Sequence, residues 1–247
     1  MRESKSLKIA IIPARGGSKR VPLKNIKTFD GTPMLARTIS TLQKSELFDQ
    51  IIVSTDSEEI RKVALRADAI CEHMRESELG DDQTPTVDVI RYEILHYGIG
   101  SDSEVCCVYA PNPFLRIDAL TIGSQILNEK PIPNYVSTVT TFPFPIQRAL
   151  KLNGEDLLEM ENKDFIMRHS QTLEERYHEC AQFWWAKART WTNKVPMQEG
   201  LKGIYLPRWM TQDIDTQEDW IQAEMRWRIL KESDDFHSYQ VTKKNII

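Results

Sequence analysis

Residues 7–20 read LKIAIIPARGGSKR. The first part of this stretch, residues 7–12, is apolar and rich in β-branched side chains, and it stops at Pro13. It predicts a strand that is buried on both faces, as in a parallel sheet. A glycine-containing loop follows, and ligands of open α/β sheets bind beyond the carboxyl ends of the strands. The loop is therefore the first candidate for a binding site.

Strand and helix patterns alternate along the chain after this loop. Helical spacing of apolar residues predicts helices, and short apolar runs predict strands. The repeated β-α-β units favour an α/β fold with a mostly parallel sheet and right-handed crossovers. The expected elements are a helix over 33–48, a strand over 51–54, helices over 57–67 and 86–97, a strand over 104–109, a helix over 118–128, strands over 134–138 and 183–185, and a closing helix over 218–231.

The pattern breaks between residues 142 and 176. Residues 142–145 read FPFP, which a central strand does not tolerate, and Asn153-Gly154 indicates a hairpin. Residues 233–247 form a polar tail that we expect to be loosely held. The sequence predicts one domain over residues 1–232, with an excursion over 142–176.

Composition excludes several classes of protein. The 247 residues include 32 Lys and Arg against 36 Asp and Glu, a net charge of -4, which argues against a nucleic-acid binder or an anionic-membrane binder. No apolar run approaches the ~20 residues that span a bilayer, and we expect no secretory signal. The four cysteines form no CxxC pair, so a reducing cytoplasm is the expected compartment.

The loop after the first strand has the chemistry of a polyphosphate site. Residues 15–27 carry five basic side chains and no acidic one. Gly16 and Gly17 let backbone N–H groups approach an anion, and the Ser18 hydroxyl adds a donor. The loop matches neither the Walker A pattern nor the GxGxxG fingerprint. A solvated basic turn is the alternative, but the position after the first buried strand favours phosphate binding.

Residues 11–20 (IIPARGGSKR) with Lys24-Asn25 resemble the signature of the CMP-nonulosonic acid synthetases, cytidylyltransferases that activate sialic acid and its bacterial relatives. FPFPIQRAL at 142–150 resembles the branch that activates pseudaminic acid. The resemblance covers about residues 7–230 and implies a single Rossmann-like nucleotidyltransferase domain. Further runs that support it are VCCVYA at 105–110, YHE at 177–179 and QFWW at 182–185.

The resemblance implies that CTP binds along the first loop. Arg15 and Lys19 would hold the triphosphate, and Lys24 would approach the α-phosphate; transfer of a nucleotidyl group depends mainly on positioning and on neutralising charge. The nucleotide-binding residues that it implies are Pro13, Ala14, Arg15, Gly16, Gly17, Ser18, Lys19, Asn25, Arg75, Asp82 and Thr86.

Two of the assignments at the base and ribose have structural alternatives. Arg75 matches the arginine of the family's RPxxL segment, which touches cytosine, although Glu76 replaces the proline here. Its alternative is an ion pair with Glu78. Asp82 and Thr86 match an acid-then-hydroxyl run near the ribose, but Thr86 could instead cap the following helix.

An acidic segment near the other end of the chain predicts a metal site. Residues 212–219 read QDIDTQED, and Asp213 and Asp215 at i and i+2 point to the same side of an extended stretch. Mg²⁺ takes one or two carboxylates together with phosphate oxygens, and the family uses this segment for its metal. Thr216 and Asp219 indicate a capping box that leaves both aspartates available. We assign Asp56, after the second strand, to a helix start and not to the metal.

The resemblance also implies a set of sugar-binding residues. Tyr109 stands where sialic acid synthetases have glutamine, which argues against sialic acid, and Arg148 could bind the sugar carboxylate. The family's Arg-Ser-Gln run reads His169-Ser170-Gln171, with Arg168 one step upstream. Phe183 could face a methyl or acetamido group or pack in the sheet. The complete set is Tyr109, Gln147, Arg148, Arg168, Gln171, Gln182 and Phe183.

The expected reaction converts CTP and a nine-carbon sugar acid, with pseudaminic acid as the expected one, into CMP-nonulosonate and pyrophosphate. The product would serve surface glycan or flagellin glycosylation. Mg²⁺ is the expected cofactor, and the resemblance implies a homodimer in which residues 142–176 cross to the partner. The catalytic residues that we expect are Arg15, Lys19, Lys24 and Asp215.

Other functions stay open at this point. A sibling enzyme would activate legionaminic, sialic or 3-deoxy-octulosonic acid. A GT-A-like glycosyltransferase is less compatible, because a diphosphate donor needs fewer cations than residues 15–27 supply. A non-catalytic nucleotide-binding protein would not need Asp213 and Asp215.

Overall fold

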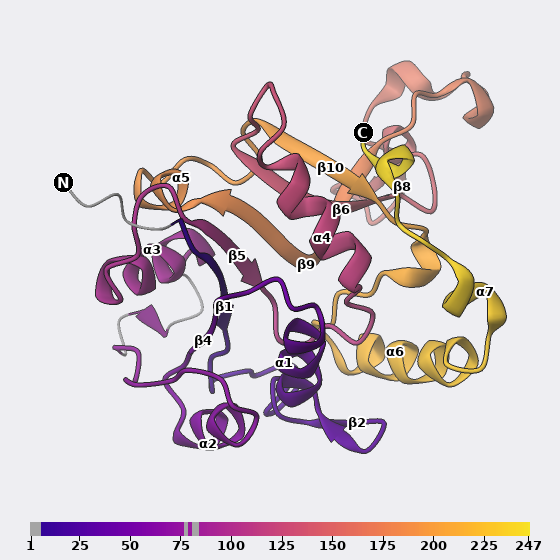
Figure 1. Cartoon of the computed structure of the whole chain (residues 1–247). Coiled ribbons are helices and arrows are strands. Elements are labelled where there is room, and N and C mark those ends of the chain that lie inside the picture. The colour runs from indigo at the N-terminus through magenta and orange to yellow at the C-terminus, as the bar shows by residue number, and fades with distance from the viewer. Residues whose placement is uncertain (1–5, 77–78, 81–83) are drawn as a thin grey trace.

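The computed structural model describes residues 6–76, 79–80 and 84–247. A six-stranded sheet in the order β10-β6-β9-β5-β1-β4 forms the centre of the molecule (Figure 1). Every neighbouring pair is parallel except the two that contain β9. The strands are β1 (Lys8–Pro13), β4 (Gln50–Ser54), β5 (Glu104–Val108), β6 (Tyr135–Thr141), β9 (Tyr177–Lys187) and β10 (Leu201–Tyr205).

Helices cover both faces of this sheet, as apolar side chains on both faces of the strands require. One apolar cluster joins α1 (Met34–Lys44), α2 (Glu58–Arg66) and α4 (Ile117–Ile126) to one face. A second cluster joins α3 (Thr86–His96) and α5 (Ala188–Thr192) to the other face. No helix in the described part of the chain has the length and apolar content needed to cross a membrane.

The remaining elements flank the sheet. Helix α6 (Gln217–Leu230) packs through Trp220 against Phe29 in the small ribbon of β2 (Thr28–Phe29) and β3 (Thr32–Pro33). It starts at the predicted capping box, in which the Thr216 hydroxyl accepts a hydrogen bond from the Asp219 N–H. Helix α6 therefore has a defined first residue, and the acidic segment just before it is held in place.

The α/β fold with a mostly parallel sheet is confirmed, and one strand direction was not predicted. Strand β9 runs antiparallel between β5 and β6 and spans 11 residues, whereas only residues 183–185 were expected as strand. Its first three residues, Tyr177 to Glu179, are exposed, so this part lacks the apolar pattern that marks the second half. Strand β10 was also missed.

Residues 142–176 project from the sheet as a separate arm (Figure 1). The arm holds the hairpin of β7 (Leu150–Leu152) and β8 (Leu158–Met160). The turn forms at Asn153, whose side-chain oxygen accepts hydrogen bonds from the N–H groups of Glu155 and Leu157. Short 3₁₀ helices complete the arm at Ile146–Arg148, Lys163–Phe165 and Ser170–Thr172.

The C-terminal tail is packed against the domain, so the expectation that it is loosely held is wrong. After α7 (Asp234–Ser238), the guanidinium of Arg116 donates hydrogen bonds to the carbonyl oxygens of Phe236 and Tyr239. Val241 is buried, and Ile246 forms a bridge with Ile204 of β10. These few apolar anchors are too sparse for a sequence pattern to reveal.

A buried carboxylate ties four elements together at the amino end of β5. Glu104 accepts hydrogen bonds from Ser124 and Asn128 and pairs with Lys187 at 3.3 Å. Burial by itself raises the pKa of Glu104, but the hydrogen bonds of Asn128 and Ser124 and the charges of Lys187 and Lys8 outweigh it and lower the pKa. The charged form of Glu104 therefore stabilises the fold.

Glu104→Gln should lower the free energy of unfolding at pH 7 by about 2 kcal/mol, because a charge-assisted network becomes a neutral one. The folded-state pKa is depressed, so this contribution is present above the unfolded-state pKa of about 4.3 and is lost as the pH falls through the folded value. The wild type and the variant should converge in acid. Urea unfolding at several pH values measures this, and Glu129→Gln, which removes an exposed ion pair, is the control. Equal stability of Glu104→Gln and wild type at pH 7 would contradict it.

Candidate active site

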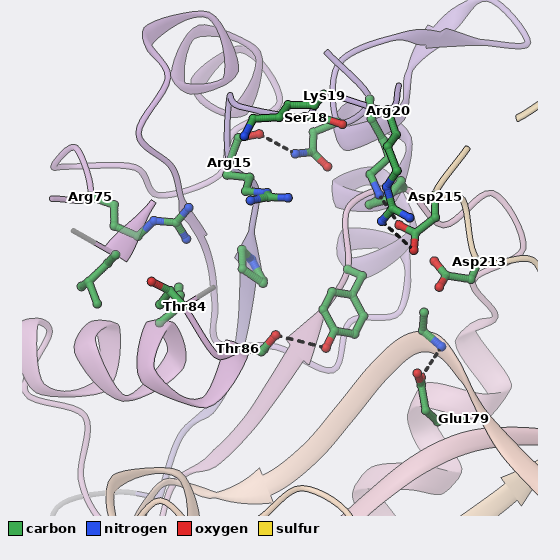
Figure 2. Close-up of a pocket in the computed structure, with 18 residues that line it drawn as sticks. Arg15, Ser18, Lys19, Arg20, Arg75, Thr84, Thr86, Glu179, Asp213 and Asp215 are labelled. Atoms are coloured by element: carbon green, nitrogen blue, oxygen red, sulfur yellow. Dashed lines mark hydrogen bonds and ion pairs between the residues drawn. The ribbon is translucent and has the colours of Figure 1, made fainter. Parts of the chain in front are cut away.

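A pocket of about 690 Å³ opens at the carboxyl ends of the parallel strands (Figure 2). Its walls come from segments that are far apart in the sequence: the loop after β1, the segment between α2 and α3, the start of α3, the end of β5, the first half of β9 and the segment before α6. The sheet order brings these segments to one edge because β1 lies between β4 and β5. This is the position that the sequence predicted for a ligand.

The loop after β1 is held in shape by its neighbours. Gly16 donates its backbone N–H to the Asp56 carboxylate at 2.7 Å, and the side-chain amide of Asn25 donates to the carbonyl oxygen of Arg15 at 2.9 Å. A β-carbon on Gly16 would lie 2.8 Å from that of Ser57, so the loop approaches α2 as closely as glycine allows. Asp56 thus orients the loop, while Ser57 caps α2.

Two basic residues of this loop meet the acidic segment before α6. Arg20 lies 3.0 Å and Lys24 lies 3.2 Å from the carboxylate of Asp215, and Lys24 also donates to the carbonyl oxygen of Ile214 at 2.6 Å. Arg20 and Asp215 are well exposed, so their pair contributes less than about 1 kcal/mol to stability. The contact matters because it places cationic donors that suit phosphate groups beside a carboxylate that suits a metal ion.

Asp213 faces the same pocket and is electrostatically strained. Its pKa is raised by loss of water around the carboxylate and then by the negative charge of Asp215, while Lys24 acts in the opposite direction. The negative charges of Glu179 and Asp219 add smaller contributions in the same direction as Asp215, and the Asp219 carboxylate also accepts the hydrogen bonds of the capping box. Two carboxylates beside a site for phosphate groups supply the oxygen ligands that a divalent cation such as Mg²⁺ prefers.

Arg75 lines the pocket from the segment between α2 and α3. The residue is only 5% exposed, and its Nε has no hydrogen-bond partner in the part of the chain that the structure describes. Burial lowers the pKa of the guanidinium, while Asp56 and Glu93 favour its charged form. A buried donor without a partner, aimed at a pocket, is suited to a ligand. Glu78, the alternative partner, lies outside the described residues.

Strands β5 and β9 form the other end of the pocket. The Tyr109 hydroxyl lies 3.3 Å from that of Thr86, and burial raises the pKa of Tyr109. Ala181 has a φ of 49°, a left-handed conformation that costs a side-chain-bearing residue about 1 kcal/mol or more. Glu179 stabilises this turn by accepting a hydrogen bond from the N–H of Ala181 at 2.6 Å.

A family model described as cytidylyltransferase matches residues 9–221. The chain belongs to the cytidylyltransferase family. The resemblance noted in the sequence is thereby confirmed, and the chain is a nucleotidyltransferase.

Individual relatives agree with this family. The pseudaminic acid cytidylyltransferase of Campylobacter jejuni is 34% identical over 231 residues, which cover 91% of this chain and 98% of the relative. The N-acylneuraminate cytidylyltransferase A of Danio rerio is 32% identical over 88% of this chain and 50% of its own length. In fold, the chain is similar to a solved CMP:2-keto-3-deoxy-manno-octonic acid synthetase complexed with CTP, with a TM-score of 0.67 at 14% identity over 92% of this chain and 100% of the other.

Most of the nucleotide and metal residues expected of this cytidylyltransferase meet at the pocket. Ala14 is buried beneath it, and Gly16 and Gly17 contribute loop backbone without lining it. Asp82 lies outside the described residues. The expected residues that line the pocket are Pro13, Arg15, Ser18, Lys19, Lys24, Asn25, Arg75, Thr86, Tyr109, Asp213 and Asp215.

Most of the expected sugar residues do not line the pocket of the single chain. Phe183 is fully buried in the apolar core, which matches its structural alternative, and Gln182 is buried with its amide donating to the carbonyl oxygen of Met210. The other four lie on the projecting arm, where Gln147 donates to the carbonyl oxygen of Glu174. These four residues are Gln147, Arg148, Arg168 and Gln171.

The sequence missed two charged residues of the pocket. Arg20 belongs to the quoted loop but was not given a role, although its charge was the available signal. Glu179 was missed because β9 was expected to begin at residue 183. No local pattern marks a carboxylate that reaches the pocket through an irregular strand.

Asp56→Ala should weaken CTP binding about tenfold, because loss of a charge-assisted hydrogen bond of roughly 1.5 kcal/mol frees Gly16 and disorders the loop. Asp56→Asn keeps an acceptor oxygen and should bind CTP nearly as the wild type does. Isothermal titration calorimetry with CTP compares the three proteins. If Asp56→Ala binds CTP like the wild type, Asp56 does not position the loop.

Proposed function

We propose that the protein transfers the cytidylyl group of CTP to a nonulosonic acid, with pseudaminic acid as the expected sugar, and releases pyrophosphate. The observation that carries this proposal is the meeting of the cationic loop after β1 with Asp213 and Asp215 in one pocket. The relative named pseudaminic acid cytidylyltransferase, which aligns over nearly its whole length, supports this choice of sugar.

The loop after β1 would hold the triphosphate. Arg15, Lys19 and Lys24 line the pocket and supply positive charge that balances the charge on the transferring and leaving phosphates. Arg75 would donate to the cytosine through its buried guanidinium, and Asn25 would contact the ribose. The family resemblance implies this division, and chemistry supports it, since phosphates need several cations and an uncharged base needs a few directed donors.

The reaction needs no protein nucleophile. The anomeric 2-hydroxyl of the sugar acid attacks the α-phosphorus in line, the bond from this phosphorus to the bridging oxygen breaks, and pyrophosphate leaves with that electron pair. The hydroxyl proton passes to solvent or to a group of the substrates. The protein contributes position and charge compensation, which the fixed cationic loop after β1 would provide.

The residues present fit a Mg²⁺ cofactor. Asp213 and Asp215 both line the cation-lined pocket, and the pKa of Asp213 is raised first by burial and then by the negative charge of Asp215; a divalent cation would relieve both effects. We propose that these two carboxylates hold it. When bound, the ion would supply Lewis-acid stabilisation of charge on phosphate oxygens.

A second copy of the chain is the proposed partner of the arm. In the hairpin, Leu150 pairs with Met160 and Leu152 pairs with Leu158 across the strands, so these four side chains share one face. Leu152 and Leu158 are each 65% exposed. A two-stranded hairpin with an uncovered apolar face is marginal by itself, and dimerisation would bring the arm's Arg148 and Arg168 toward another pocket.

The cytoplasm is the proposed compartment. All four cysteines are buried and unpaired, which suits a reducing environment. Surface glycan or flagellin glycosylation stays the proposed fate of the product.

The purified protein with CTP, Mg²⁺ and pseudaminic acid should release pyrophosphate, and legionaminic, sialic and 3-deoxy-octulosonic acids should react at least tenfold more slowly. Asp215→Asn should abolish turnover with an unchanged melting temperature, because it removes a carboxylate charge from an exposed position. Asp235→Asn on α7 is the control, because Asp235 does not line the pocket. Normal pyrophosphate release by Asp215→Asn would refute the metal assignment, and preference for another sugar acid would correct the substrate.

Leu152→Glu with Leu158→Glu should convert a dimer into a monomer, since two charges would be buried in the interface. Light scattering after size-exclusion chromatography measures the mass. Leu95→Glu, at a similarly exposed leucine of α3, should leave the dimer intact. A monomeric wild-type protein at micromolar concentration would contradict the proposed assembly.

A further inference from the structure

Glu179 is an acidic side chain of the pocket that the steps above do not use. It lines the pocket beside Tyr109 and Ala181. In Figure 2 it lies beyond Asp213, on the opposite side of the pocket from Arg15 and Lys19. All basic lining residues in the described part of the chain come from the loop after β1 and from the segment between α2 and α3, and none comes from β9. Glu179 therefore faces the end of the pocket that the phosphates do not need.

An irregularity in β9 holds Glu179 in place. The pairing of β9 with β6 shifts by three residues between Trp184, opposite Ser137, and Glu179, opposite Val139. Such bulges redirect side chains and recur beside active sites. The turn passes through Ala181 with its positive φ, and the N–H of Ala181 donates to Oε2 of Glu179. One carboxylate oxygen is thus bound by the protein's own backbone, which fixes the side chain.

The second oxygen of Glu179 is available to a ligand. Among residues 6–76, 79–80 and 84–247, no basic side chain forms an ion pair with this carboxylate. Its negative charge contributes to the raised pKa of both Tyr109 and Asp213, after burial, which is the main cause in each case. The negative charge of Glu179 therefore acts on both Tyr109 and Asp213.

The sign of the charge selects what Glu179 can bind. A carboxylate repels phosphate oxygens and the carboxylate of a sugar acid, and it has no hydrogen to donate. It accepts strong hydrogen bonds from O–H and N–H groups. We propose that Glu179 recognises the sugar acid by accepting a hydrogen bond from an uncharged donor, a hydroxyl or an acylamino N–H. This inference rests on the proposed function, because it requires a sugar acid as the second substrate.

Glu179→Gln separates recognition from a purely structural role. The N–H of Ala181 still needs an acceptor, so the amide oxygen of glutamine takes that place and its NH₂ group faces the pocket. A donor then replaces the acceptor that the sugar meets. We expect KM for the sugar acid to rise at least tenfold, with the dissociation constant for CTP alone and the melting temperature unchanged. Glu199→Gln, at an exposed acid outside the arm that does not line the pocket, is the control and should leave KM unchanged.

Sugar acids that each lack one hydroxyl or acylamino N–H identify the donor. For the wild type, removing the donor that Glu179 binds should weaken the affinity for the sugar acid. For Glu179→Gln, removing the same donor should change the affinity little, because the contact is already lost. An unchanged KM for the sugar acid in Glu179→Gln would show that Glu179 only holds the turn, and a fall in kcat alone would assign it to another step; either result overturns the inference. If the wild type binds CTP but reacts with no sugar acid, the proposed function fails and the inference fails with it. If the wild type reacts and Glu179→Gln matches it, only the inference fails.

Discussion

Asp215 lies between Arg20 and Lys24, and these ion pairs join the loop after β1 to a segment 191 residues later in the chain. The contact contributes little to stability, because Arg20 and Asp215 are exposed and only Lys24 is partly buried. Its importance is geometric. It places an acid that suits a metal ion next to cations that suit phosphates, and the capping box of α6 keeps the acid at this point of the backbone. The remaining walls of the pocket are arranged around this contact.

The central position of β1 makes the contact possible. Because β4 and β5 pair with β1 in parallel, their carboxyl ends bring Asp56 and Tyr109 to the same edge as the loop. Strand β9 closes the far side by running antiparallel, and its irregular pairing with β6 turns Glu179 into the pocket. The site is thus divided by charge: the parallel strands supply the cationic loops, and the antiparallel strand supplies neutral groups and one carboxylate.

The sequence predicted the features that depend on neighbouring residues. The buried run of β1, the glycine loop, the helix spacing and the Thr216–Asp219 cap are local, and the structure contains each of them. The direction of β9, the packed tail and the position of Glu179 depend on residues far away in the chain. The place of Glu179, for example, follows from its register with Val139, which no periodicity in residues 177–182 encodes. Resemblance to a family predicted nucleotide residues of which most line one pocket, but it placed Phe183 in the sugar site, whereas the structure places it in the core.

Charge division in the pocket also bears on the assembly. In the described part of the chain, the basic lining residues lie on the loop after β1 and between α2 and α3, and the end of the pocket that we propose for the sugar presents Glu179. A sugar acid carries its own carboxylate, which Glu179 repels, so this group needs a cation from elsewhere. Arg148 and Arg168 are exposed on an arm whose hairpin has an uncovered apolar face. If a second copy covers that face and brings these arginines to the pocket, one constraint explains both the exposed leucines and the missing cation. In that arrangement Glu179 would orient the uncharged donors of the sugar while the arm binds its carboxylate, and a monomer would bind CTP without completing the sugar site.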